Sequence, residues 1–168
     1  MAHRPDGLPD KISDLDSLLG LREQYRKTGQ IVVWTNGCFD ILHVGHVRSL
    51  QAARGFGDVL IVGVNSDVSV KALKGAKRPI VTERQRAEVL AALACVDHVL
   101  IFDETTPEGI LARLQPDVHC KGADYAPPHG KPVPEAAVVE AYGGRVAYLP
   151  LVPELSTTDI VKRIRHLG

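Results

Sequence analysis

The chain has 168 residues, 45% of them hydrophobic, and its 20 basic and 20 acidic residues give a formal net charge of zero. This length and composition predict one globular domain, residues 1–168, with a substantial core. Zero net charge and an aromatic content of only 5% argue against a polyanion-binding surface or a base-stacking platform, so we expect no nucleic-acid partner. The N-terminus has no apolar signal core and no run is long enough to span a bilayer. We therefore expect a cytoplasmic protein without a membrane partner.

Residues 1–10 are polar and rich in proline, so we expect them to be mobile. Ser13 is a potential N-cap, with Asp16 as its capping partner, for a leader helix over 13–28 that ends at Gly29. Beyond it, apolar runs alternate with capped or amphipathic stretches. The runs predict strands at 31–35, 58–64, 96–102, 117–121 and 145–149. The intervening stretches predict helices at 45–54, at 82–93 with a Thr82–Gln85 capping box, from 106 onwards, at 134–142 and at 157–167.

The alternation of strands and helices predicts an α/β fold, a Rossmann-like parallel five-stranded sheet with helices on both faces. Such sheets bind ligands beyond the carboxyl ends of the strands, where the strand order reverses. The segments 35–46, 65–67 and 121–122 each follow a predicted strand. The sequence therefore predicts that these three segments meet in one site.

The segment 35–46 is the most informative, because it joins a strand to a helix through a glycine-bearing turn that carries His43 and His46. A helix N-terminus offers free N–H groups and a positive dipole end, and the two histidines add side-chain donors. This indicates binding of nucleotide phosphates, with transfer at the α-phosphate. The main alternative is a metal site made by both histidines with Asp40 and Cys38, although the glycine and the turn favour phosphates. Asp40 has three open roles: orienting a histidine, binding acceptor hydroxyls or stabilising the turn.

The pattern Phe39-Asp40-x-x-His43-x-Gly45-His46 resembles the H-x-G-H signature of the nucleotidylyltransferase superfamily. Over residues 11–166 the chain is similar to the heptose 1-phosphate adenylyltransferases of lipopolysaccharide precursor synthesis. Further motifs carry this resemblance in the family's order, namely Asn65-Ser66-Asp67, Lys74-Gly75 with Arg78-Pro79, Lys121-Gly122-x-Asp124-Tyr125 and Ser156-Thr157-Thr158. The ordered set is far more specific than H-x-G-H alone.

The resemblance implies three groups of site residues. Catalytic roles fall to His43, His46 and Lys74. Nucleotide binding is expected of Thr35, Asn36, Gly37, Cys38, Phe39, Gly45, Lys121, Gly122, Asp124, Ser156, Thr157 and Thr158. Acceptor binding is expected of Asp40, Asn65, Asp67 and Arg86. The alternatives are a solvated loop around Lys74, a surface position for Arg86 and simple N-capping by Ser156. Mg²⁺ is expected to accompany the triphosphate rather than to bind protein side chains.

The resemblance further implies transfer of a nucleotidyl group, AMP from ATP, to D-glycero-β-D-manno-heptose 1-phosphate, giving NDP-heptose and pyrophosphate. The expected partners are ATP or another NTP, the sugar 1-phosphate and a second copy in a homodimer. Alternatives are a cytidylyltransferase acting on glycerol 3-phosphate or another small phosphate, a guanylyl variant, and a non-catalytic nucleotide-binding protein. The cytidylyltransferase alternative is weakened because residues 150–155 lack the arginine that those enzymes carry there. A stand-alone enzyme is expected, since the chain has no room for a sugar kinase domain.

Overall fold

The computed structural model describes residues 10–150 and 157–167. The expected mobility of residues 1–10 concerns a segment that lies, apart from Asp10, outside this part. The elements alternate along the chain as the apolar runs predict. Helices and strands follow in the order α1 (Leu15–Lys27), β1 (Val32–Gly37), α2 (Val44–Arg54), β2 (Val59–Asn65), α3 (Asp67–Lys74), α4 (Glu83–Ala91), β3 (His98–Phe102), α5 (Glu108–Leu114), β4 (Val118–Gly122), the 3₁₀ turn η1 (Ala123–Tyr125), α6 (Ala136–Ala141), β5 (Arg145–Leu149) and α7 (Thr157–Arg165).

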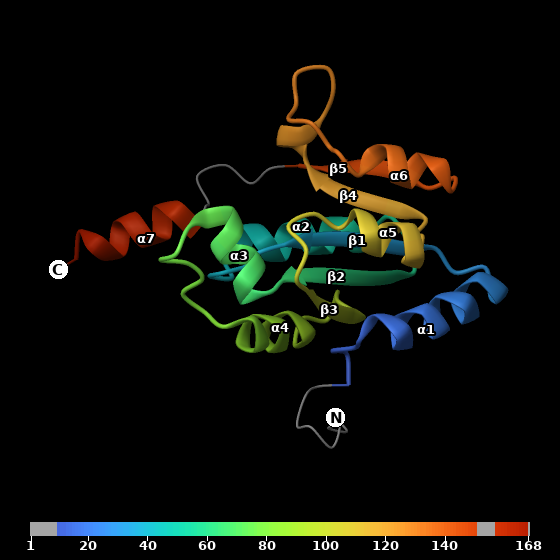
Figure 1. Ribbon diagram of the computed structural model, residues 1–168, viewed down its shortest axis with the longest axis horizontal. Coiled ribbons are helices and arrows are strands. Elements are labelled where there is room, and N and C mark those ends of the chain that lie inside the picture. Colours follow the sequence, from blue (N-terminus) through green and yellow to red (C-terminus); the bar gives the residue numbers. More distant parts are fainter. Residues whose placement is uncertain (1–9, 151–156, 168) are drawn as a thin grey trace.

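The five strands form one sheet in the order β3-β2-β1-β4-β5, and each neighbouring pair is parallel. The chain first builds the sheet outward from β1 to β3 and then returns to add β4 on the other side of β1. The strand order therefore reverses between β1 and β4, where Trp34 pairs with His119 (Figure 1). The predicted parallel five-stranded sheet is confirmed.

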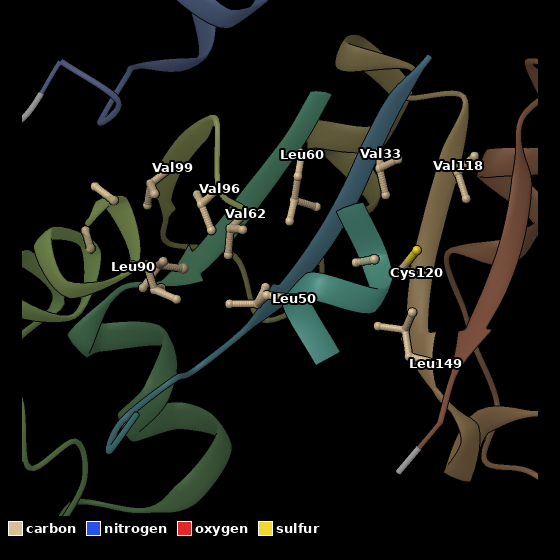
Figure 2. Close-up of a cluster of buried hydrophobic side chains, with 14 of the residues drawn as sticks. Val33, Leu50, Leu60, Val62, Leu90, Val96, Val99, Val118, Cys120 and Leu149 are labelled. Atoms are coloured by element: carbon tan, nitrogen blue, oxygen red, sulfur yellow. The ribbon is translucent and has the colours of Figure 1, made fainter. Parts of the chain in front are cut away.

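The core has two layers, because successive side chains of a strand point to opposite faces of the sheet. Val33 packs with the helices α2 and α4 on one face, whereas Trp34 packs with α1, α5 and α6 on the other. Figure 2 shows the first layer, in which Leu50 of α2 and Leu90 of α4 lie over the strands. Burying each large aliphatic side chain contributes about 1.5–3 kcal/mol. The predicted placement of helices on both faces is confirmed.

Two predicted caps are wrong. Asp14 rather than Ser13 caps α1, and its carboxylate accepts a hydrogen bond from the Ser17 N–H at 2.7 Å. Ser13 instead extends the leader's pairing with the edge strand β3, since its N–H donates to the Val99 carbonyl. The Thr82 hydroxyl does not cap α4 but donates to the side chain of Gln85 at 3.1 Å.

A third correction concerns residues 67–74, where the sequence predicted no helix and left a solvated loop around Lys74 as an alternative. They form the helix α3, whose N-cap Ser66 accepts from the Ser69 N–H at 3.2 Å. Asp67 lies in its first turn, while Lys71 and Lys74 lie in its last turn. This charge distribution matches the helix dipole. Lys74 is therefore carried by a helix end rather than by a loop.

Candidate active site

Most of the predicted site residues line pockets beyond the carboxyl ends of β1 and β4, at the reversal of the strand order. Two pockets meet there, a smaller one of about 220 Å³ and a larger one of about 450 Å³. Asn36, Gly37, Cys38 and Lys74 line both pockets, so these residues mark the junction. Another groove, of about 480 Å³, lies between the start of α1 and the end of β3, but no predicted site residue lines it.

The turn from β1 to α2 has a left-handed residue. Phe39 has φ of +47°, a conformation that is uncommon for residues other than glycine. Its ring packs edge-on against the ring of His46, with 5.3 Å between the centroids. This contact between the two rings links the turn to the first turn of α2.

His43 and His46 cap the N-terminus of α2. The Nδ1 atom of His43 accepts a hydrogen bond from the Gly45 N–H at 3.2 Å. In return, the Nδ1 atom of His46 accepts from the His43 N–H at 3.4 Å. The two imidazole rings stack with their centroids 3.9 Å apart. The histidines thus form a reciprocal capping box, an arrangement better known for serine with glutamate.

These hydrogen bonds assign the tautomer of both rings. A neutral imidazole that accepts at Nδ1 carries its proton at Nε2, so each ring has an Nε2–H donor to offer. Burial lowers the pKa of His43. Burial, the neighbouring His43 and the charge of Lys74 lower the pKa of His46 to about 4. At neutral pH the N-terminus of α2 therefore carries two uncharged N–H donors, and the His46 ring lines the smaller pocket, whereas His43 lines neither pocket.

Asp40 anchors a loop rather than facing either histidine. Its carboxylate accepts from the Ile80 and Val81 N–H groups at 2.7 and 3.0 Å, and it forms an ion pair with Arg78 at 2.6 Å. The Asp40 side chain is fully buried in doing so. Of the three roles left open by the sequence, the structure shows a local stabilising one, although the anchored segment is 78–81 rather than the turn itself.

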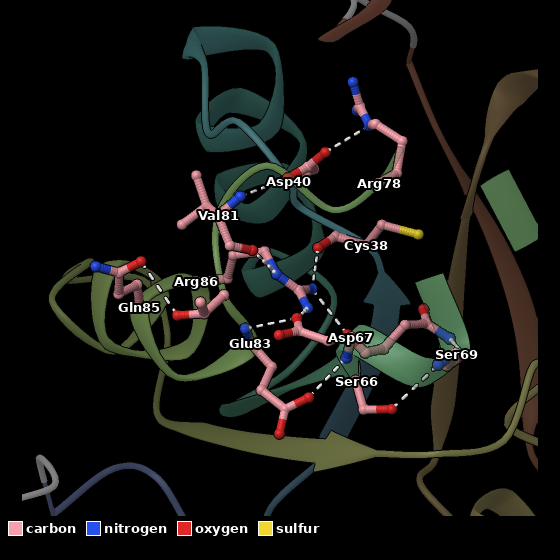
Figure 3. A network of polar contacts seen from close by, with 12 residues as sticks. Cys38, Asp40, Ser66, Asp67, Ser69, Arg78, Val81, Glu83, Gln85 and Arg86 are labelled. Carbon is pink, nitrogen blue, oxygen red and sulfur yellow. Dashed lines mark hydrogen bonds and ion pairs between the residues drawn. The ribbon is translucent and has the colours of Figure 1, made fainter. Parts of the chain in front are cut away.

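Arg86 holds three segments of the site together (Figure 3). Its guanidinium donates to the carbonyls of Cys38, Asn65 and Val81 and forms an ion pair with Asp67 at 2.7 Å. The Arg86 side chain is only 1% exposed. The alternative of a surface arginine is therefore wrong. The predicted contact with the acceptor would require these buried bonds to break, so the geometry gives Arg86 a positioning role.

Asp67 and Asn65, predicted to bind the acceptor, are also engaged within the protein. Asp67 accepts from the Glu83 N–H at 2.8 Å, and its own N–H donates to the Glu83 carboxylate at 2.6 Å. The Asn65 amide donates to the Ser69 hydroxyl and to the carbonyl of Glu104. Asn65 still lines the larger pocket, whereas Asp67 lines neither pocket.

The predicted nucleotide-binding residues are spread over both pockets. Thr35, Phe39 and Gly122 line the smaller one and Lys121 lines the larger one. Thr35 is 8% exposed, and its hydroxyl donates to the carbonyl of Cys120 within the sheet.

Other members of that predicted group lie apart from the pockets or outside the described residues. Asp124 lines neither pocket and pairs with Lys131 at 2.6 Å. Thr157, at the start of α7, lines the smaller pocket, and Thr158 is exposed. Ser156 lies outside the described residues.

Two residues at the site were missed by the sequence reasoning. Glu135, just before α6, is 1% exposed and pairs with Lys121 at 2.7 Å. His119, fully buried in β4, lies 3.1 Å from the same Glu135 oxygen. Because His119 and Lys121 are two residues apart on a strand, they point to one face. That spacing was the available signal, but the partner carboxylate lies 14 residues further along.

Two absences hold for residues 10–150 and 157–167. No three histidine, cysteine, aspartate or glutamate side chains gather there as a potential metal-ion site. Within the same ranges, no helix is both long and apolar enough to cross a membrane.

Comparison with known proteins places these features in a family. Residues 34–163 match the family described as cytidylyltransferase-like. The chain belongs to this family. The match begins in β1 and extends into α7, so it covers the turn with both histidines and both pockets. The predicted membership in the nucleotidyltransferase superfamily is confirmed.

Several curated relatives carry the name bifunctional protein HldE, among them those from Geotalea uraniireducens and Syntrophotalea carbinolica. The one from Geotalea uraniireducens is 53% identical over 155 residues, which is 92% of this chain and 31% of that protein. The one from Syntrophotalea carbinolica is 49% identical over 164 residues, which is 98% of this chain and 33% of that protein. The chain thus spans about a third of the length of these relatives.

Two solved structures share the fold. A lipopolysaccharide core biosynthesis protein from Thermoplasma volcanium superposes with a TM-score of 0.58 at 28% identity, covering 74% of this chain and 98% of that one. A pantoate–β-alanine ligase from Francisella tularensis gives the same TM-score at 15% identity, covering 92% of this chain and 76% of that one. The second likeness concerns the fold alone.

Proposed function

We propose that the chain transfers a nucleotidyl group from a nucleoside triphosphate to a sugar 1-phosphate and releases pyrophosphate. The observation that carries this proposal is the pair of stacked histidines at the N-terminus of α2, each with an Nε2–H to donate, beside Lys74. Membership in the cytidylyltransferase-like family supports the same reaction class.

In this reaction an oxygen of the acceptor phosphate attacks the α-phosphorus, and the bond from that phosphorus to the bridging oxygen of the leaving pyrophosphate breaks. The acceptor oxygen is already ionised, so no general base is needed. Catalysis then consists of positioning and of stabilising charge on the phosphoryl oxygens. His43 and His46 donate hydrogen bonds to those oxygens, the positive end of the α2 dipole stabilises their charge, and the Lys74 ammonium offsets the charge of the triphosphate.

Magnesium enters this proposal with the triphosphate. The described carboxylates that line the two pockets belong to Asp40 and Glu135, and both form ion pairs with protein cations. The pockets therefore suit a metal that is held by phosphate oxygens and water, as Mg²⁺ commonly is. When bound, Mg²⁺ would neutralise part of the triphosphate charge.

We further propose ATP and D-glycero-β-D-manno-heptose 1-phosphate as the substrates. The resemblance to heptose 1-phosphate adenylyltransferases supports this choice, as does the similarity to a solved lipopolysaccharide core biosynthesis protein. The test is pyrophosphate release with ATP, CTP, GTP and UTP, each offered with the heptose phosphate and with glycerol 3-phosphate. Release only with CTP and glycerol 3-phosphate would keep the reaction class and overturn the substrates. No release with any pair would overturn the proposed function.

The homodimer predicted from the sequence is a separate proposal. Light scattering, which gives the mass of the protein in solution, would test it.

Variants of His43 separate its structural role as N-cap of α2 from its proposed role as a hydrogen-bond donor to the substrate. His43→Ala removes both the N-cap of α2 and the donor, so we expect lower turnover and a stability loss of about 1 kcal/mol. His43→Asn restores a good cap without the Nε2–H. It should therefore recover stability while turnover stays at least about 100-fold below wild type. Turnover within about threefold of wild type in His43→Asn would contradict the donor role.

A further inference from the structure

A buried group of three side chains lies beneath the larger pocket. Glu135 accepts hydrogen bonds at one oxygen from Lys121, at 2.7 Å, and from His119, at 3.1 Å. Lys121 and Glu135 both line the pocket, but the Lys121 side chain is 15% exposed, whereas those of His119 and Glu135 are at most 2% exposed. The carboxylate is thus hidden and the ammonium is the member of the group that a ligand can reach.

In this group His119 is neutral and Glu135 is anionic. Burial lowers the pKa of His119, which keeps the ring neutral and lets its Nε2–H donate to the carboxylate. Burial alone would raise the pKa of Glu135, but the hydrogen bonds from His119 and Lys121 lower it to about 2. Glu135 is therefore anionic at neutral pH, and its charge faces Lys121.

The geometry fixes the Lys121 ammonium from two sides. Its Nζ atom lies 4.7 Å from the centre of the Tyr125 ring as well as 2.7 Å from Glu135. An ammonium has three donors, so those not used by Glu135 remain for a ligand. Lys74 lines the same pocket. Two lysines on one pocket are suited to a phosphate group.

Stability alone is a weak reason for such a group. A buried ion pair contributes little net stability, and apolar residues of similar volume often replace one without loss. We propose that Glu135 is a positioning residue for nucleotidyl transfer, and that with His119 it holds the Lys121 ammonium where it binds a phosphate group of a substrate. This inference rests on the proposed function. The phosphate belongs either to the nucleotide or to the acceptor, and the experiment distinguishes these sources.

The test is a double-mutant cycle with Lys121→Met and Glu135→Gln, read by calorimetric titration with MgATP and, separately, with D-glycero-β-D-manno-heptose 1-phosphate. We expect each single variant to weaken binding of one of the two ligands by at least about tenfold, because a charge-assisted hydrogen bond is lost or misplaced. The ligand affected identifies the phosphate. In the Lys121→Met background, Glu135→Gln should have no further effect, since Glu135 acts only through Lys121.

The matched control is Lys131→Met. Lys131 lies 5.3 Å from the same Tyr125 ring but lines neither pocket, so both affinities should stay within about twofold of wild type. If Glu135→Gln does not fold, Glu135→Asp is the second variant. It keeps the negative charge but moves the carboxylate away from Lys121, and we expect the same selective loss of affinity. Effects of the two substitutions that simply add, or unchanged affinities in Lys121→Met, would overturn the inference. Intact binding without pyrophosphate release would overturn only the proposed function.

Discussion

Removing the guanidinium of Arg86 should destabilise the whole protein rather than merely weaken substrate binding. In Arg86→Met, three carbonyls and the Asp67 carboxylate lose their donor in a region where the arginine side chain is 1% exposed. Breaking a buried charge pair by removing one partner costs about 3–5 kcal/mol. That is a large part of the 5–15 kcal/mol that a typical domain has.

The assay is equilibrium unfolding in urea. With a slope of about 2 kcal/mol per molar, a loss of 4 kcal/mol lowers the unfolding midpoint by about 2 M. The unfolding midpoint of Arg86→Lys should be nearly as low, because one ammonium cannot reach four acceptors in three segments. The control is Arg84→Met, on the same helix. There the side chain is 59% exposed and pairs with Glu88, so we expect a change below about 1 kcal/mol.

The contrary result is equally clear. If Arg86→Met unfolds within about 1 kcal/mol of wild type and changes only the KM for the acceptor, then Arg86 is a substrate contact, as the sequence resemblance implied. The network in Figure 3 would then be a state that the ligand rearranges.

Two further predictions concern the histidine pair and the core. The His46 ring should titrate near pH 4 by NMR, so the fold should lose stability as pH falls from 6.5 towards 4, where the unfolded state binds the extra proton. A His46 pKa near 6.5 would contradict the burial that the structure shows. Gly63→Ala should cost about 1–3 kcal/mol in urea unfolding, because the added methyl would lie 2.4 Å from the Trp34 ring. An unchanged free energy of unfolding would mean that the Trp34 ring can move aside for the methyl group.

The sheet could be predicted from the sequence because its signals are local. The strand β2 is a nearly continuous apolar run, as buried parallel strands are, and β1, β3 and β5 are largely apolar. The turn with both histidines directly follows β1. The helix α3 was missed for a local reason as well. It has only eight residues between its cap Ser66 and Gly75, and Val68 and Leu73 remain exposed. Eight residues give only about two turns, so little of a helical period can be recognised in the sequence.

The roles of the polar residues at the strand ends could not be predicted in the same way. Asp40 contacts the Val81 N–H 41 positions away, and Asp67 contacts Arg86 across 19 positions. A carboxylate that binds an acceptor and one that anchors a neighbouring loop look alike in sequence. Only the packing of α3 and α4 against the ends of β1 and β2 distinguishes these alternatives.

The pairing of these carboxylates within the protein explains how a chain with zero net charge can present a site for anions. Among the described residues that line the pockets, the carboxylates of Asp40 and Glu135 are both held by cations of the protein. The pocket-lining groups left with donors to spare are His46, Lys74 and Lys121, which lie near the positive end of the α2 dipole. The positive character of the site therefore arises from which charges are already paired, and it is local to the ends of β1 and β4. Substituting Arg78, which lines neither pocket, would free the Asp40 carboxylate and should therefore weaken phosphate binding without removing a contact to the ligand.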